Sequence, residues 1–223
     1  MMLEIKKISL PVLLFSLVSL ASAQETKKVS KNTSIQLATL KENYEVLKTN
    51  PKIKQGSYSA QIRSYAEKGQ YDQDKKSGIW EFSKNGVVFQ KYDFSKEEFL
   101  LDEPSKMVKI KLLDDNGEPG KDLEPIHFYT GGDPKIMNAF LYFIYPRLAA
   151  QNKVGGVVTV SAILTKDGKI INEKAESKLG SGLEEEVLRI FEMIPPCWIP
   201  LQVDGKPVDV KISIQSSFMI PKS

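Results

Sequence analysis

Hydrophobic and polar residues in the C-terminal part of the chain alternate first with a helical period and then with a strand period. Asp133-Pro134 predicts a helix start, because the aspartate can accept hydrogen bonds from the first turn and proline at the first helical position loses none. We expect Pro146 to break or kink this helix and to restart it, and Gly155-Gly156 to end it. Its apolar residues are Ile136, Met137, Phe140, Phe143, Ile144, Leu148 and Ala149.

Strand signals follow this helix. Val157–Thr165 alternates apolar and polar side chains, which predicts a half-buried strand. Asp167-Gly168 predicts a tight hairpin turn, because both central positions of a type I′ turn need positive φ, and Ile170–Ser177 is the expected return strand. Asp204-Gly205 turns the chain into a last alternating segment, Val208–Phe218, which we expect to be a third strand.

A second helix is expected between the second and third strands. Ser181 and Glu184 have the spacing of a capping box, in which each side chain bonds a free amide at the helix start. An apolar stripe continues from there to Pro195-Pro196, which ends the helix. The stripe consists of Leu183, Val187, Ile190, Phe191 and Ile194.

Connection rules turn these elements into a fold. Strands joined by a tight turn are antiparallel neighbours, and a strand–helix–strand crossover joins parallel strands along a right-handed path. The simplest arrangement places Val157–Thr165 in the middle of three strands, with both helices on one face. We therefore predict an α+β domain of order α-β-β-α-β, two helices on a three-stranded antiparallel or mixed sheet, in which Val208–Phe218 is a free edge.

A series of short motifs in this region resembles the C-terminal domain of TonB-type proteins, over residues 125–223. Two departures stand out: Pro196-Cys197 separates Pro195 from Trp198 where the family has a plain Pro-x-Trp, and Leu201 stands where the family often has glycine. The matching motifs are Phe128-Tyr129-Thr130-Gly131-Gly132, Tyr145-Pro146-Arg147-Leu148-Ala149, Gly156-Val157-Val158-Thr159-Val160, Lys166-Asp167-Gly168-Lys169-Ile170, Leu188-Arg189, Met193-Ile194-Pro195, Trp198-Ile199-Pro200 and Asp204-Gly205-Lys206-Pro207-Val208.

Glycine and aromatic residues recur earlier in the chain, between Ile53 and Phe99. Gly-Ile-Trp follows Gly-Ser-Tyr and Gly-Gln-Tyr, and Asn85-Gly86 is a further hairpin signal. The pattern predicts a β-meander with glycines in the turns and aromatic side chains packed across strands. It resembles MORN-like repeats of the bacterial antitoxin type, and we assign residues 51–113 to this module, with Met107–Leu113 as one more strand. An ordinary antiparallel extension without a ligand is the favoured alternative.

Flanking segments complete the organisation. Residues 24–50 are a polar lead-in, in which Ile35, Leu37, Leu40, Tyr44 and Leu47 indicate either a short helix or an extended segment. Residues 114–124 contain Asp-Asn-Gly, Pro-Gly and acidic residues, so they are interpreted as a linker. At 223 residues with 41% hydrophobic content, the chain can bury one or two modest cores.

The N-terminus has the pattern of a secretory signal peptide over residues 1–23. Lys6-Lys7 precedes an apolar run, and Ala21-Ser22-Ala23 is an A-x-A cleavage site, which makes Gln24 the expected mature N-terminus. We expect a periplasmic or secreted protein. The alternative is an uncleaved membrane anchor, although a spanning helix needs about 20 apolar residues and this run is shorter and contains a proline.

Little in the sequence indicates catalysis or cofactor binding. The net charge of +3 gives no basic footprint for nucleic acid. His127 is the single histidine and Cys197 the single cysteine, so a metal site built from these ligands is not expected, and Cys197 is predicted to be a buried free thiol. Gly131-Gly132 lacks a phosphate-loop lysine, and Glu184-Glu185-Glu186 fits a helix N-terminus. We predict no enzyme, no cofactor and no metal.

The resemblance implies protein binding in the cell envelope. TonB-type domains recognise short segments of outer-membrane partners by adding them as a strand to a sheet edge, whose unpaired N–H and C=O groups supply the hydrogen bonds. The edge could instead be protected, or paired in a homodimer. The predicted docking edge is Val208, Val210, Lys211, Ile212, Ser213, Ile214 and Gln215.

We therefore expect an exported interaction module for an outer-membrane transporter or another envelope partner. One alternative is a membrane-anchored TonB-type energy transducer with an uncleaved N-terminus, a role for which the Pro-rich spacer is missing. The other is an enzyme with an unrecognised site, which predicts a deep polar pocket with convergent carboxylates.

Overall fold

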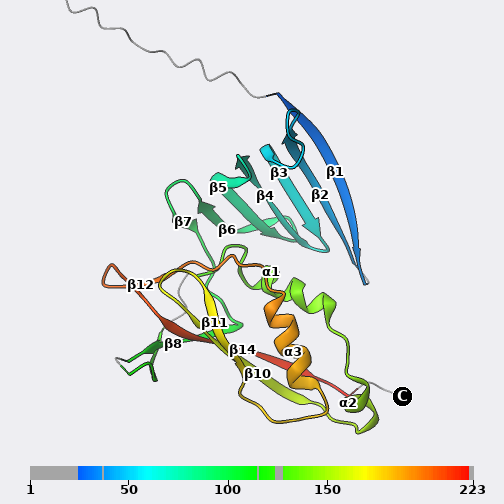
Figure 1. The fold of residues 1–223 in the computed structure, drawn as a ribbon, viewed down its shortest axis with the longest axis vertical. Coiled ribbons are helices and arrows are strands. Elements are labelled where there is room, and N and C mark those ends of the chain that lie inside the picture. The colour runs from blue at the N-terminus through cyan, green and yellow to red at the C-terminus, as the bar shows by residue number, and fades with distance from the viewer. Residues whose placement is uncertain (1–24, 37, 115, 124–127, 221–223) are drawn as a thin grey trace, which may run out of the picture.

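The computed structural model of the chain describes residues 25–36, 38–114, 116–123 and 128–220. These residues form two large antiparallel sheets, one above the other, with α1 between them (Figure 1). We call them the N-terminal sheet, β1 to β7, and the C-terminal sheet, of order β11-β10-β14-β8-β9. The predicted signal peptide at 1–23 and His127 lie outside the described residues.

The N-terminal sheet is a meander of seven strands in chain order, so the chain is β-rich well before residue 51. The short helix considered for residues 24–50 is wrong: this segment forms β1 and β2. Leu40 and Tyr44 are four residues apart and pair with Ile62 and Tyr58 of β3, and this spacing satisfies a strand period as well as a helical one. The strands are β1 Thr26–Ile35, β2 Ala38–Leu47, β3 Lys54–Ile62, β4 Tyr65–Asp72, β5 Lys75–Lys84, β6 Val87–Asp93 and β7 Glu98–Leu101.

One face of this sheet carries a continuous row of aromatic rings. Trp80 is fully buried at its centre, with Tyr58 and Tyr71 rings at centroid distances of 5.4 and 5.3 Å. Gly69 on β4 makes room for the indole, because a Cβ there would lie 2.4 Å from its ring atoms. Recurring glycine and aromatic residues therefore belong to one packing unit, in which a glycine on one strand accommodates the aromatic side chain of the next.

The C-terminal sheet contains the predicted strand trio and two further strands. β10 (Gly156–Leu164) lies between β11 (Ile170–Ala175) and β14 (Val210–Phe218), as the connection rules predict. β8 (Val108–Leu113) is the strand expected near 107–113, but it pairs with β14 instead of extending the meander. The expected linker at 114–124 contains β9 (Pro119–Leu123), which pairs with β8. The sheet therefore has five strands instead of three. A separate hairpin, β12 (Leu201–Val203) and β13 (Lys206–Val208), turns at Asp204-Gly205.

Pro146 breaks the first helical region, as predicted. α1 (Gly132–Ala139) continues into the 3-10 turn η1 (Phe140–Tyr142), the chain leaves helical geometry at Phe143, and α2 (Arg147–Gln151) starts after Pro146. The expected cap at Asp133 is wrong, because Gly131 occupies the cap position in the left-handed region. The Asp133 carboxylate instead accepts hydrogen bonds from the Ser105 hydroxyl and the Lys106 amide, which tie α1 to the segment that enters β8.

The capping box of the second helix is also wrong in its details. α3 (Leu183–Glu192) has Gly182 at its cap with no side-chain bond. Glu184 reaches back, but its carboxylate accepts hydrogen bonds from the Leu179 and Gly180 amides. The left-handed conformation of Gly182 moves the cap position one residue beyond Ser181, so the serine hydroxyl accepts a hydrogen bond from the side-chain amide of Asn152 instead.

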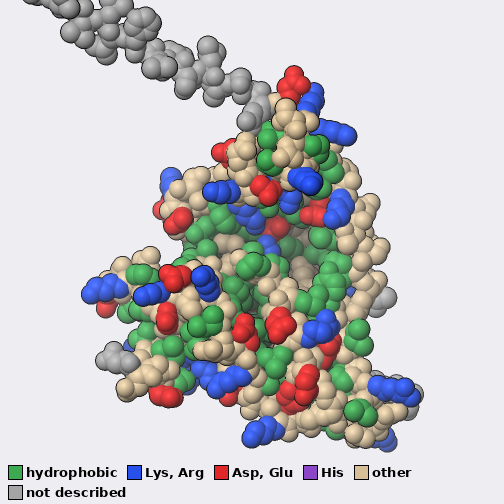
Figure 2. Space-filling model, viewed as in Figure 1, with side chains coloured by type: hydrophobic (Ala, Val, Ile, Leu, Met, Phe, Trp, Pro, Cys, Tyr) green, Lys and Arg blue, Asp and Glu red, His purple; other side chains and the backbone are tan. Residues whose placement is uncertain are grey.

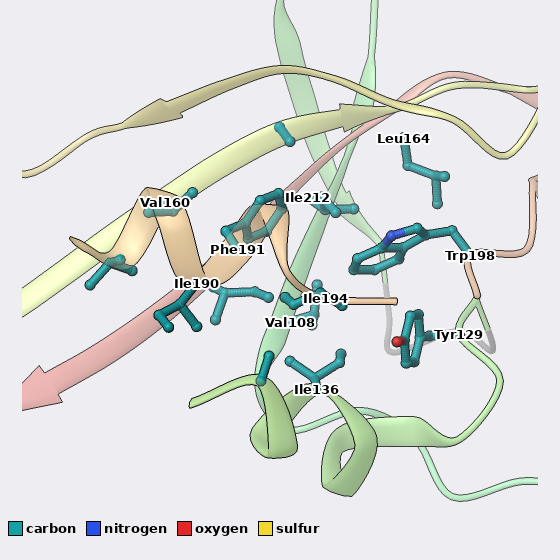
Figure 3. Packing of buried hydrophobic residues seen from close by; sticks show 14 of the residues in the cluster. Val108, Tyr129, Ile136, Val160, Leu164, Ile190, Phe191, Ile194, Trp198 and Ile212 are labelled. Atoms are coloured by element: carbon teal, nitrogen blue, oxygen red, sulfur yellow. The ribbon is translucent and has the colours of Figure 1, made fainter. Parts of the chain in front are cut away.

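The main core lies between the helices and one face of the C-terminal sheet. Ile136 of α1 and Ile190 of α3 are fully buried, and they pack in one cluster with Val160 of β10 and Ile212 of β14 (Figure 3). Val108 of β8 enters the same cluster, so β8 completes the core of the domain that follows it in sequence.

Candidate functional site

The predicted docking edge is mostly an interior strand. β14 pairs with β10 on one side, and Val210–Ile214 pair with Leu112–Val108 of β8 on the other. Val210, Ile212 and Ile214 are at most 1% exposed, while Val208 belongs to β13. The free edge is therefore wrong over Val210–Ile214. The physical reason is that β8 pairs along this side of β14, because the pairing buries the alternating side chains Val108 and Ile110.

β14 remains open only beyond the end of β8. Its last four residues, Gln215–Phe218, pair with β10, and no described strand pairs with their other side. We call this segment the open end of β14. The Phe218 ring stacks on Phe143 at a centroid distance of 4.6 Å, and the neighbouring Met219 and Val157 side chains are 89% and 48% exposed. An unpaired strand end thus lies beside apolar side chains that are accessible to a partner.

The β11, β9 and β1 edges have features that oppose strand addition. On β11, the register with β10 shifts between Ser161 and Ile163, and Asn172 has φ +56°, so the edge is bulged. β9 is short, begins with Pro119 and also has a register shift. The ten-residue β1 edge carries Lys27, Lys28 and Lys31. Such bulges, prolines and lysines are the usual protection of edge strands, so the open end of β14 is the better candidate.

A second candidate site is a cavity of about 420 Å³ between the aromatic face of the N-terminal sheet and the helical layer. We call it the intersheet cavity. Figure 2 shows the molecule hollowed between the two halves, with hydrophobic side chains around the opening. The strand side of the lining includes Tyr58, Tyr65, Glu67, Tyr71 and Lys76, and the opposite side includes Lys135, Asn138, Tyr142, Met193, Pro195 and Cys197.

A buried ion pair crosses this cavity from sheet to helix. The Lys135 ammonium of α1 lies 2.8 Å from a carboxylate oxygen of Glu67 on β4, and the two side chains are 11% and 10% exposed. The Tyr65 hydroxyl donates a hydrogen bond to the same carboxylate at 3.0 Å. Burial alone would raise the pKa of Glu67, but Lys135 and then Lys76 outweigh it and hold that pKa below its usual value. Likewise, burial opposes the charge of Lys135, yet the Glu67 carboxylate raises its pKa.

Lys76 on β5 is a second ammonium group in the cavity. Its Nζ lies 3.9 Å from the centroid of the buried Trp80 ring, a cation–π contact, and 5.2 Å from that of Phe94. No carboxylate of the described residues lies within ion-pair distance of it. Burial, followed by the nearby charge of Lys135, lowers the pKa of Lys76 to about 8. The cavity therefore holds a cation whose charge the surrounding protein only partly balances.

A buried glutamine provides a further link between the two sheets. Gln90 on β6 is 1% exposed. Its side-chain amide donates to the Tyr129 carbonyl at 3.0 Å, and its side-chain oxygen accepts from the Gly131 amide at 2.5 Å. These bonds hold the segment that leads into α1 against the N-terminal sheet. The two sheets are thus joined by a buried polar contact as well as by the ion pair.

None of these cavity residues was predicted as a site. A signal was nevertheless present in the strand period. It places Glu67 on the same face of β4 as Tyr65, and Lys76 on the same face of β5 as Trp80. Two charged side chains among buried rings could therefore be expected. Cys197, expected to be buried, is half-buried and free in the cavity wall. Over the described part of the chain, no cluster of three metal-ligating side chains occurs, and no helix is long and apolar enough to cross a membrane.

Comparison with known proteins supports one of the two sequence resemblances. Residues 142–220 match the family model described as Gram-negative bacterial TonB protein C-terminal. The match spans η1 to the end of β14, and it supports the TonB C-terminal family for this part of the chain. That family consists of non-enzymatic domains that interact with envelope proteins such as outer-membrane receptors. No curated protein and no solved structure matches the chain. The MORN-like resemblance of the first module stays a prediction.

Proposed function

We propose that this protein is an exported interaction module of the cell envelope, which binds a segment of another polypeptide at the open end of β14. The observation that carries the proposal is the TonB-type match over 142–220, the stretch that contains β14 and the apolar residues beside its end. The partner is an extended segment of an outer-membrane transporter or another envelope protein.

The physical basis is the combination of free backbone groups and accessible apolar surface. A net contribution of about 1 kcal/mol per main-chain hydrogen bond means that the four-residue edge Gln215–Phe218 gives a weak complex by itself. Apolar side chains of the partner can add to this by covering Phe218 and Met219, of which Met219 is strongly exposed. The proposed complex is therefore a short added strand anchored by one or two hydrophobic side chains.

β8 limits how far an added strand can extend. Pairing along Val210–Ile214 requires displacement of Val108 and Ile110, which are 6% and 3% exposed in the core. We therefore place the partner beside Gln215–Phe218 only, where nothing has to be displaced.

Two proline variants test this placement. Along a strand, successive N–H groups point to opposite sides, so one of Ser216 and Ser217 donates towards β10 and the other outwards. Proline removes the donor. The variant that loses the bond to β10 is expected to have a lower free energy of unfolding, and the other is expected to keep its stability but lose partner binding. Unfolding in urea identifies which is which.

Partner binding is measured with a photo-crosslinking amino acid placed at Met219, and compared with the same group at Glu173 on the bulged β11 edge. We expect envelope polypeptides to be crosslinked from Met219, and the product to disappear in the stable proline variant. Crosslinking from Glu173 alone, or an unchanged product in both proline variants, would show that the open end of β14 is not the docking site.

A further inference from the structure

The charge of the intersheet cavity indicates what it can bind. Lys76 and Lys135 bring two ammonium groups and Glu67 brings one carboxylate, so the cluster has an excess of one positive charge. Glu67 is already engaged by Lys135 at 2.8 Å and by the Tyr65 hydroxyl at 3.0 Å. Lys76 contacts aromatic faces, 3.9 Å from the Trp80 centroid, and the charges that act on it include both Lys135 and the already engaged Glu67. A single negative charge beside Lys76 is the complement of this arrangement.

Charges further along the aromatic face do not alter this balance. Glu42 accepts a hydrogen bond from the Tyr58 hydroxyl at 3.0 Å, and Lys54 lies over the same ring, 5.1 Å from its centroid. Neither residue lines the cavity, and their opposite charges balance each other. On the other face of the N-terminal sheet, a larger hollow of about 830 Å³ contains Glu81, which Lys68 and Lys91 already pair at 2.8 and 2.6 Å. The unbalanced cation is a feature of the intersheet cavity.

The remaining lining is mostly apolar or aromatic and defines the body of the ligand. The walls consist of Ile35, Leu40, Ala60, Ile62, Tyr142, Met193 and Pro195. About 420 Å³ is within the range of small-molecule sites, which combine apolar walls with a few polar groups that fix orientation. A fully hydrated small anion would leave these walls uncovered, whereas an amphiphile covers them and places its charge at Lys76.

We propose that the intersheet cavity binds a small amphiphilic carboxylate, with the carboxylate at the Lys76 ammonium and the apolar chain against Ile62, Leu40 and Met193. The ligand contacts β2, β3 and β5 on one side and the helical layer on the other, so it lies across the junction of the two sheets. This site is separate from the open end of β14, and its test is independent of partner binding.

The experiment uses decanoate, below its micelle concentration, titrated into the protein with calorimetry or the fluorescence of Trp80 as the readout. Decanol, which has the same chain without the charge, is the ligand control. We expect decanoate to bind at least tenfold more tightly than decanol, because only decanoate can pair with Lys76. Equal binding of the two compounds, or no binding of decanoate, overturns the proposal.

Matched lysine variants locate the binding. Lys76→Met is expected to weaken decanoate at least tenfold and to remain folded, since it removes a poorly balanced buried charge. Lys54→Met is the control: it removes another lysine that lies over aromatic rings but does not line the cavity, and decanoate affinity should change by less than twofold. Lys76→Arg keeps the charge and should retain most of the affinity, so it decides the question if Lys76→Met fails to fold. Undiminished binding to folded Lys76→Met, lost binding in Lys76→Arg, or a loss in Lys54→Met as large as that in Lys76→Met contradicts the assignment.

Discussion

Replacing Lys135 by methionine tests whether the ion pair across the intersheet cavity holds the two halves of the molecule together. Lys135 Nζ and the Glu67 carboxylate are 2.8 Å apart and both side chains are about nine-tenths buried. Methionine fills nearly the same volume without the charge. The variant therefore leaves the Glu67 carboxylate buried, with the Tyr65 hydroxyl and the more distant Lys76 as its remaining support.

The loss in the free energy of unfolding depends on the Glu67 carboxylate, which stays buried when Lys135 is replaced. Removing one partner of a buried pair costs about 3 to 5 kcal/mol, because the other charge stays buried without compensation. We expect Lys135→Met to lower the free energy of unfolding by about 3 kcal/mol, at the low end because Lys76 remains close. Glu67→Gln should cost a similar amount, since it leaves two ammonium groups together. The double variant should cost only about 1 kcal/mol, which gives a coupling energy of several kcal/mol.

Urea unfolding followed by tryptophan fluorescence measures these differences, since Trp80 lies in the N-terminal sheet and Trp198 in the C-terminal core. Lys68→Met is the control: the Lys68–Glu81 pair is also 2.8 Å long, but the Lys68 side chain is 67% exposed, so its loss should cost less than about 1 kcal/mol. If the losses in the free energy of unfolding for Lys135→Met and Lys68→Met differ by less than about 0.5 kcal/mol, the argument from burial is refuted.

Three further predictions concern the same region. Gly69→Ala should lower the free energy of unfolding by about 3 kcal/mol and change the near-ultraviolet circular dichroism of Trp80, because the new methyl group would lie 2.4 Å from the indole. Gln90→Leu should cost about 2 to 3 kcal/mol in urea unfolding, because the Gly131 amide and Tyr129 carbonyl lose their buried partner. The pKa of Lys76 falls from 10.5 to about 8 on folding, so the unfolded chain binds more protons between these values and stability contributed by this residue rises with pH. The free energy of unfolding of the unchanged protein minus that of Lys76→Met should rise by about 1.5 kcal/mol from pH 8 to 9.5. A difference that does not change with pH would contradict this prediction.

Local signals in the sequence predicted the elements that depend on near neighbours. The alternation of Val157–Thr165 and the Asp167-Gly168 turn correspond to β10 and its hairpin with β11. The type I′ geometry is wrong, because only Gly168 of the two residues has positive φ, +75°, and its amide bonds the Thr165 carbonyl. The stripe from Leu183 to Ile194 is buried along α3 and beyond. These patterns are short-range, because turn geometry and side-chain period are properties of a few consecutive residues.

The lead-in shows where periodicity is ambiguous. Leu40, Tyr44 and Leu47 are spaced by three or four residues, as on a helix, while Leu40, Tyr44 and Val46 also share one parity, as on a strand. The sheet selects the strand over the helix. Leu40 and Tyr44 pair with Ile62 and Tyr58 of β3, so extended pairing buries the aromatic row. That partner strand comes later in the chain, and the period of the lead-in alone contains no information about it.

The position of β8 explains why the predicted docking edge was wrong even though the strand itself was predicted. Alternation of Val108, Ile110 and Leu112 indicates a strand with one buried face, but it fits the aromatic sheet before it and the C-terminal sheet after it equally well. The choice depends on β14, a hundred residues away along the chain, whose Ile212 lies opposite Ile110. Once this pairing forms, the edge that we predicted for strand addition is occupied by the chain itself over five residues, Val210–Ile214. The length of β8 therefore sets the length of β14 edge that stays open, and the partner that we propose has to bind with a shorter strand and rely more on the apolar side chains beside Phe218.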